Sequence, residues 1–169
     1  MKRGLIGTYL TSAIMNAVPM SSYVAHLRSL IGTEMLHMPS VTAVCRDGVG
    51  RVLLVQERDS GSWTTPGGAI EPGEVPEVAL IREVQEESGL SVVVKELVTA
   101  LGGPEYRTIY SNGDELSYVA LVYDATVVGG SPTPDGDETS GVAWFSLEDV
   151  TQIPKTNFFS LLLRDVGLS

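Results

Sequence analysis

The sequence is poor in cysteine and histidine. Its single cysteine, Cys45, cannot form an internal disulfide bond, so nothing in the sequence indicates an oxidising compartment. Cys45 ends the apolar run 41–45, where a small buried side chain is expected rather than a nucleophile. The two histidines, His26 and His37, lack the spacing of metal ligands, and we expect them to be structural or exposed.

Basic side chains are also scarce. Eleven Lys and Arg residues stand against 21 Asp and Glu residues, which gives a net charge of −10. Because the phosphate backbone of a nucleic acid requires a basic surface, we expect no nucleic-acid polymer as a partner. A small phosphorylated ligand is still compatible with this charge if metal ions stand between the carboxylates and the phosphates.

Long apolar runs are missing as well. The mildly apolar stretch 5–18 follows Lys2 and Arg3, which is the outline of a signal peptide, but polar residues interrupt it and it is too short to span a bilayer. In the alternative interpretation Met20 is the natural start and the preceding residues are an extension. We expect a cytoplasmic protein without a membrane association. Its 169 residues, 43% of them hydrophobic, suit one globular domain, placed at 39–169 after an N-terminal extension at 1–38.

Hydrophobic periodicity predicts alternating strands and helices. Ser21 and Ser22 are expected to cap a short helix over 23–31, which ends at Gly32. Pro39 is expected to interrupt the chain before a strand at 41–46. The other expected strands are 51–57, 63–65, 91–101, 105–110, 115–128 and 142–145, and the other expected helices are 76–88, 147–150 and 157–165. A turn at 111–114 and a polar loop at 129–140 complete the pattern.

The predicted helix at 76–88 carries three glutamates on one face. Glu83, Glu86 and Glu87 are spaced i, i+3 and i+4, so their charges repel one another. A divalent cation such as Mg²⁺, which prefers oxygen ligands, would relieve this repulsion. Taken alone, the three residues are more typical of a solvated acidic face, because Glu is a good helix former. The apolar side chains expected to anchor the helix are Leu80, Ile81 and Val84.

The residues around the glutamates favour a site. Gly68 permits a close backbone approach, and its carbonyl is placed to reach a metal. Glu74 precedes Arg82 by eight residues, so a loop leading into the helix can join the two in an ion pair that orients the ligands. Glu74 also suits the positive end of the helix dipole, and both interpretations remain open.

Residues 68–90 match a known pattern. Gly68, Glu74, the Arg82-Glu83 pair, the Glu86-Glu87 pair and Gly89 stand at the fixed positions of the Nudix box, and aliphatic residues follow where the pattern requires them. The chain is therefore similar to the Nudix hydrolase family, with similarity that extends over about residues 39–165. The segment 110–114 resembles a bacterial subgroup of uncertain substrate. Thr65 departs from the pattern, because many relatives have a larger apolar residue before Pro-Gly-Gly.

The resemblance implies a fold and a reaction. The fold is an α/β/α sandwich with a mixed central sheet, here with an N-terminal helical extension. The reaction is the hydrolysis of a pyrophosphate bond in a nucleoside di- or triphosphate derivative, such as a nucleoside triphosphate or ADP-ribose, by water activated by Mg²⁺ or Mn²⁺. The implied metal ligands are Glu83, Glu86, Glu87 and the Gly68 carbonyl, supported by Arg82 and Glu74.

The remaining roles stay open. The general base is Glu86 or Glu138, with Asp135 and Asp137 as weaker candidates. For Glu138, Asp135 and Asp137 a solvated acidic loop is the alternative interpretation. Candidate substrate contacts are Arg58, Trp63, Tyr106, Tyr110, Tyr118 and Asn157, whereas Arg51 is expected to be exposed in a turn. Two other functional classes remain open. One is an inactive nucleotide-binding or regulatory Nudix domain, and the other is a module whose acidic helix is a protein interface. A homodimer is also open.

Overall fold

The computed structural model describes residues 21–110 and 112–167. The two interpretations of the first nineteen residues, a leader or an extension, lie outside this range. Among the described residues, no helix has both the length and the apolar character needed to cross a membrane.

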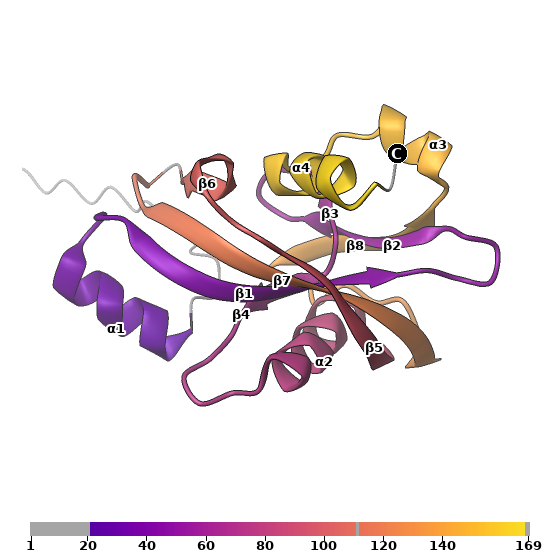
Figure 1. Ribbon diagram of the computed structural model, residues 1–169, viewed down its shortest axis with the longest axis horizontal. Coiled ribbons are helices and arrows are strands. Elements are labelled where there is room, and N and C mark those ends of the chain that lie inside the picture. Colours follow the sequence, from indigo (N-terminus) through magenta and orange to yellow (C-terminus); the bar gives the residue numbers. More distant parts are fainter. Residues whose placement is uncertain (1–20, 111, 168–169) are drawn as a thin grey trace, which may run out of the picture.

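Two β-sheets form the centre of the molecule (Figure 1). The larger sheet has the order β4-β1-β7-β5, and β6 also pairs with β7. Strands β1 and β7 are parallel and the other pairs are antiparallel, so the sheet is mixed. Its strands are β1 (Leu36–Cys45), β4 (Gly67–Ala69), β5 (Leu90–Leu101), β6 (Arg107–Ile109) and β7 (Glu115–Gly130). The smaller antiparallel sheet joins β3 (Trp63–Thr64), β2 (Val52–Glu57) and β8 (Thr139–Phe145).

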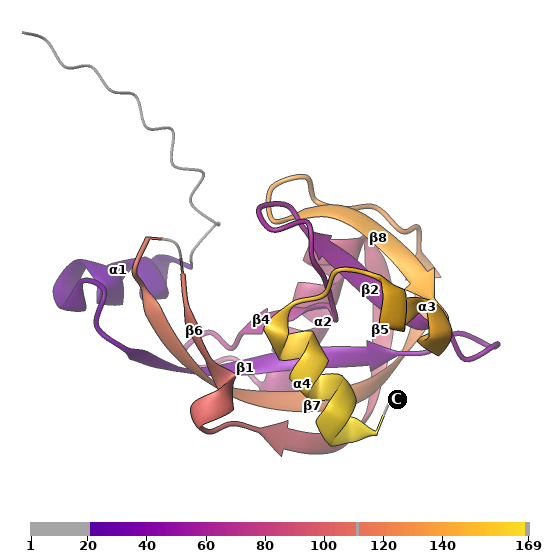
Figure 2. The same cartoon turned by 90° about the horizontal axis from the view of Figure 1, so that it is seen from above.

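The helices complete the layers. Figure 1 shows α2 (Pro76–Ser88) on one side of the strands and α3 (Leu147–Gln152) and α4 (Asn157–Val166) on the other. A 3₁₀ turn, η1 (Pro104–Tyr106), occupies the first part of the predicted strand at 105–110. The predicted α/β/α sandwich with a mixed sheet is thus confirmed. The predicted N-terminal helix is also present as α1 (Ser22–Ile31), which lies at one end of the molecule (Figure 2).

Helix α2 forms as its sequence predicts. Pro76 occupies the first turn, where its missing N–H is not needed, and Gly89 ends the helix in the left-handed conformation with φ 69°. Leu80 and Val84 are fully buried in the main hydrophobic cluster, as expected. Ile81 is 41% exposed, so its predicted anchoring role is wrong. It lies about 100° of helical rotation beyond Leu80 and therefore turns away from the sheet.

Strand β1 begins at Leu36, so the predicted interruption at Pro39 is wrong. The Pro39 carbonyl accepts a hydrogen bond from the Ile70 amide at 3.1 Å, which shows that its backbone polar groups face the β4 side of the strand. The missing N–H lies opposite Ile70, where the chain has already passed the end of β4 at Ala69. A proline is tolerated there because at most one ladder hydrogen bond is lost.

Pairing in the two sheets also moves several other boundaries. Strand β8 starts at Thr139 rather than at 142, because Thr139 already pairs with Glu57. Strand β7 continues to Gly130, where it pairs with Leu90, so the polar loop is shorter than predicted. These partners are distant in sequence, and local composition does not reveal them.

Candidate functional site

The loop before α2 is joined to the helix by a paired salt bridge. Arg82 donates from Nε and Nη2 to the two carboxylate oxygens of Glu74, both at 2.9 Å, and Nη2 also reaches the Ala69 carbonyl at 3.1 Å. The hydrogen bond from Arg82 holds the pKa of Glu74 below its usual value, and the same contact raises the pKa of Arg82. The ion pair predicted from the spacing of these residues is therefore present.

The same guanidinium contacts two of the three clustered glutamates. Its Nη1 donates to Glu83 at 2.7 Å and to Glu86 at 3.1 Å. Glu83 is 12% exposed, whereas Glu86 is 58% exposed. The three glutamates thus differ in environment, although they share one helix face.

Two adjacent glycines allow the backbone to approach these carboxylates. The Gly67 amide donates to Glu87 Oε2 at 2.8 Å. At Gly68, an added Cβ would lie 2.6 Å from each atom of the Glu83 carboxylate. The Glu83 carboxylate therefore occupies a place that a side chain at position 68 would fill.

The carboxylates are in a site that disfavours their charge. Burial raises the pKa of Glu87 well above its ordinary value, and the charges of Glu83 and Glu138 add to the rise. Burial also raises the pKa of Glu83, against the opposing effect of Arg82. A cation among these groups would offset both the desolvation and the repulsion.

The donor set suits a hard divalent metal. It consists of carboxylate oxygens and a backbone carbonyl, which are ligands that Mg²⁺ and Mn²⁺ accept. Within residues 21–110 and 112–167, no three acidic, histidine or cysteine side chains are already gathered as a metal cluster. The present partners explain this, since Arg82 holds Glu83 and Glu86 while the Gly67 amide holds Glu87. Metal binding would require these side chains to exchange partners.

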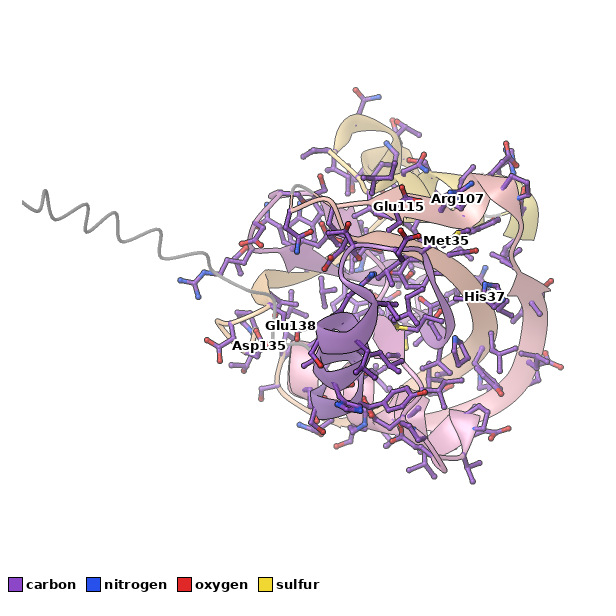
Figure 3. All side chains as sticks on the ribbon, turned by 90° about the vertical axis from the view of Figure 1, so that its left-hand side faces the viewer. Met35, His37, Arg107, Glu115, Asp135 and Glu138 are labelled. Carbon is purple, nitrogen blue, oxygen red and sulfur yellow. The ribbon has the colours of Figure 1, made fainter. Side chains whose placement is uncertain are left out.

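A second segment brings another acid to the site. The loop before β8 is organised by Asp135, whose Oδ1 accepts the amides of Asp137, Glu138 and Thr139 at 2.9, 3.0 and 2.9 Å. The buried Thr139 hydroxyl lies 2.9 Å from the Glu87 carbonyl, which joins this loop to the end of α2. Figure 3 shows Asp135 and Glu138 on the same loop. Burial, with repulsion from Glu83 and Asp135, raises the pKa of Glu138 to about 7.

An open cleft of about 930 Å³ connects these elements. Gly68, Glu87 and Glu138 line it, so the glycine loop, α2 and the acidic loop face the same space. Arg58 lines it as well, but its guanidinium donates to the Gly136 carbonyl and its amide donates to the Glu138 carbonyl at 2.8 Å. Arg58 therefore supports the acidic loop in addition to facing the cleft.

The aromatic candidates divide into two groups. Tyr110 and Tyr118 line the cleft, and their hydroxyls are 2.7 Å apart. Trp63 is not among the described residues that line it and packs edge-on against Phe145 with ring centroids 4.7 Å apart. Tyr106 is buried at 5% exposure and donates to Asp165 at 2.7 Å. Tyr106 is thus a core residue, whereas Trp63 is partly buried against the same hydrophobic cluster and is outside the described lining of the cleft.

The cleft is also lined by three polar residues that the sequence did not single out, Thr42, Lys155 and Thr156. The Thr42 hydroxyl donates to the Thr65 hydroxyl at 2.7 Å, and both residues are buried. The Thr65 position, unusual for the family pattern, is therefore stabilised by a polar contact. Lys155 and Thr156 lie beside Asn157 at the start of α4, and all three face the cleft. A single lysine in a short connection carries no pattern from which its place could be predicted.

Comparisons with known proteins agree with this geometry. A family model described as the NUDIX domain matches residues 36–163. The chain is 34% identical over 117 residues to a MutT-like protein of Streptomyces ambofaciens, covering 69% of each chain. It is 31% identical over 96 residues to a putative 8-oxo-dGTP diphosphatase of Bacillus subtilis, covering 57% of this chain and 58% of that protein.

Solved structures show the same likeness. The crystal structure of a MutT NUDIX hydrolase from Burkholderia pseudomallei superposes with a TM-score of 0.64 at 28% identity, covering 76% of this chain and 97% of that one. The family match spans the cleft, the glycine loop and α2 together. The chain therefore belongs to the Nudix family and is a hydrolase of phosphorus-containing anhydrides in nucleotide derivatives.

Proposed function

We propose that this protein hydrolyses a pyrophosphate linkage in a nucleoside di- or triphosphate derivative, with Mg²⁺ or Mn²⁺ as cofactor and water as the nucleophile. The observation that carries the proposal is the convergence of Glu83 and Glu87 from α2 with Glu138 from a separate loop. Each of these carboxyls has a pKa raised by burial and by neighbouring charge. Glu87 and Glu138 line the cleft, and carboxylates in this environment suit a hard divalent cation that would neutralise substrate phosphates.

Four groups would hold the metal. Glu83, Glu86 and Glu87 would supply carboxylate oxygens, and Gly68 its carbonyl. When bound, the cation would neutralise the diphosphate and lower the pKa of a coordinated water. Arg82 would then give up its contacts with Glu83 and Glu86 and keep its paired contact with Glu74. In that arrangement Arg82 fixes the helix relative to the glycine loop.

Glu138 is the better placed of the two candidate bases. It lines the cleft next to Thr139, which contacts the end of α2, and is fixed through its amide and carbonyl to Asp135 and Arg58. Glu86 is more exposed and is not among the described residues that line the cleft. A base must come within hydrogen-bond reach of the attacking water, which favours a residue that faces the substrate. Glu86 then serves as a metal ligand alone.

The rest of the cleft would bind the nucleotide. Arg58 and Lys155 would interact with phosphates, although Arg58 is already engaged with Gly136. Tyr110 offers a ring for stacking, and Asn157 offers an amide for a base edge.

The test is turnover on a panel of nucleotides. Purified protein is incubated with nucleoside triphosphates, 8-oxo-dGTP and ADP-ribose, with Mg²⁺, with Mn²⁺ or with a chelator, and the products are identified by chromatography and mass spectrometry. Metal-dependent release of a nucleoside monophosphate is expected for at least one compound. The absence of turnover on all of them, with either metal, would contradict the proposal.

Single substitutions then separate the roles. Glu87→Gln is expected to lower kcat by about 10²-fold or more and to weaken Mg²⁺ binding in calorimetry, because it removes a ligand charge. Glu138→Gln should lower kcat similarly while leaving Mg²⁺ binding in the absence of nucleotide within about twofold. Glu77→Gln, on the same helix but in its first turn, is the matched control and should change neither.

A further inference from the structure

Helix α1 and residues 112–114 of the hairpin turn after Tyr110 have no role in the chemistry described above. The family match begins at residue 36, after α1, and the turn lies between β6 and β7. The two features nevertheless contact one another through one side chain. Arg28, in the last turn of α1, has only 9% of its side chain exposed.

Arg28 joins three backbone carbonyls and one carboxylate. Its Nη1 donates to Gly32 at 3.2 Å and to Glu34 at 2.6 Å, which fixes the chain that leaves α1. Its Nη2 donates to the Glu115 carbonyl at 2.8 Å, and its Nε lies 3.6 Å from Asp114 Oδ2. A guanidinium suits this position because its donors are fixed in a planar fork and reach several acceptors at once.

The hairpin turn is itself tightly bonded. The amide of Tyr110 donates to the Asp114 carbonyl, and the Gly113 amide donates back to the Tyr110 carbonyl, both at 2.9 Å. Asn112 and Asp114 exchange two further hydrogen bonds at 3.0 Å. A displacement of Asp114 would therefore also displace Asn112 and the backbone of Tyr110.

Other contacts hold the base of the hairpin. The Glu115 amide donates to the Thr33 carbonyl at 3.3 Å, on the segment that follows α1. The Glu115 side chain accepts from Arg107 across the hairpin at 3.0 Å, and Figure 3 shows these two side chains close together. The contact between Glu115 and Arg107 lies within the hairpin, whereas the contacts of Arg28 and Thr33 link the hairpin to α1 and the segment after it.

The same hairpin supplies the two tyrosines of the cleft. Tyr110 follows β6, and Tyr118 lies in β7 and pairs with Met38 of β1. Their hydroxyls form a hydrogen bond at 2.7 Å. Tyr110 is 40% exposed, so its ring is available to a ligand. The position of this ring depends on the turn, which Arg28 holds.

We propose that Arg28 is a positioning residue for substrate binding, which holds the β6–β7 hairpin so that the Tyr110–Tyr118 pair faces the cleft. Helix α1 then supports nucleotide binding through this hairpin, although the helix lies outside the family match. The proposal rests on the proposed function in that the cleft binds the nucleotide. It predicts an effect on substrate affinity and none on metal binding, because Arg28 contacts neither α2 nor the glycine loop in the hydrogen bonds of the described residues.

The test compares two arginine variants. Arg28→Met keeps the apolar stem and removes the donors, and it is expected to raise KM about tenfold with kcat within about twofold. Arg51→Met is the matched control, since Arg51 is 50% exposed and its side chain pairs, among the described residues, only with the nearby Asp47 in its turn. It should leave KM unchanged. Mg²⁺ binding measured by calorimetry should be the same in both variants.

Two more measurements separate a positioning role from a general loss of stability. Hydrogen exchange of amides 107–119 should be faster in Arg28→Met than in the wild type. Tyr118→Phe should also raise KM, and its combination with Arg28→Met should raise KM less than the product of the two single effects. An unchanged KM in Arg28→Met, or independent effects in the double variant, would overturn the proposal.

Failure of this proposal can be distinguished from failure of the proposed function. Wild-type turnover on the nucleotide panel tests the function by itself. If the wild type turns over no compound, the Kd for a non-hydrolysable ADP analogue replaces KM, and the same tenfold change relative to Arg51→Met is expected. If Arg28→Met does not fold, Asp114→Asn removes the ion pair, keeps a side-chain oxygen that can accept from Asn112, and should shift KM or Kd in the same direction. No shift in that variant would overturn the proposal.

Discussion

Replacing Gly68 with alanine should lower turnover about 10²-fold while leaving the fold nearly intact. Gly68 is not among the glycines with a positive φ, so its backbone accepts an alanine. The added Cβ, however, would lie 2.6 Å from Cδ, Oε1 and Oε2 of Glu83. These atoms form the end of a flexible side chain and can move without disturbing the core.

The required movement follows from the contact distance. Ordinary van der Waals contact for a Cβ begins at 3.4 Å, so the Glu83 carboxylate must retreat by 3.4 − 2.6 Å, or about 0.8 Å. Misplacement of a catalytic group by about 1 Å can lower turnover by about 10²-fold. The free energy of unfolding should fall by about 1 kcal/mol or less, because a side-chain rotation relieves the clash.

The adjacent glycine provides the matched control. At Gly67 an added Cβ would lie 2.2 Å from the Val41 carbonyl oxygen and 2.7 Å from the Thr42 Cα, which are backbone atoms of a central strand. Gly67→Ala should therefore lower the free energy of unfolding by at least about 2–3 kcal/mol. The two neighbouring substitutions are expected to differ in kind, one affecting turnover and the other affecting stability.

The assays are urea denaturation, calorimetric titration with Mg²⁺ and steady-state kinetics on the substrate found in the panel. Gly68→Ala should show a near-normal denaturation midpoint, weaker Mg²⁺ binding and a kcat about 10²-fold lower. Wild-type activity and Mg²⁺ affinity in a folded Gly68→Ala protein would refute the reasoning, because the Glu83 carboxylate would then not need its present position.

Two further predictions concern stability and reactivity. Arg82→Lys loses the planar guanidinium that contacts both oxygens of Glu74, and the free energy of unfolding measured by urea denaturation should fall by about 1–2 kcal/mol. An unchanged denaturation midpoint would show that the paired contact does not stabilise the fold. Cys45 is fully buried and burial raises its pKa to about 12, so it should react with a thiol reagent at pH 8 only after unfolding, whereas rapid labelling of the native protein would contradict that placement.

Local signals in the sequence were sufficient to predict α2 and its supporting ion pair. Pro76 and Gly89 mark the two ends of one helix, and Glu74 and Arg82 are eight residues apart on that helix and the loop before it. Residues so close in sequence are also close in space. The interruption expected at Pro39 was wrong because tolerance of a proline depends on where the neighbouring strand ends. That information resides in pairing between distant segments.

The part of the site that lies within one motif could likewise be predicted from the sequence. The metal-ligand candidates share a helix and a motif, so their proximity follows from helical geometry. The place of Glu138 beside them depends on the loop before β8, which Thr139 joins to Glu87 across 52 residues of sequence. The separation of Trp63 from the cleft likewise depends on its packing against Phe145. Neither contact has a local pattern.

The two sides of the cleft are supported by different parts of the chain, and this has a functional consequence. Helix α2 is held at its middle by the contacts of Arg82 with the preceding loop. Its end is held by Thr139 and by the Thr133 amide, which donates to the Ser88 carbonyl at 2.8 Å. The tyrosine side depends on a hairpin and on α1. Substitutions in the hairpin can therefore change substrate affinity without moving the carboxylates. We expect variants of the hairpin to alter KM and variants near α2 to alter kcat, because no described element links the hairpin turn directly to α2.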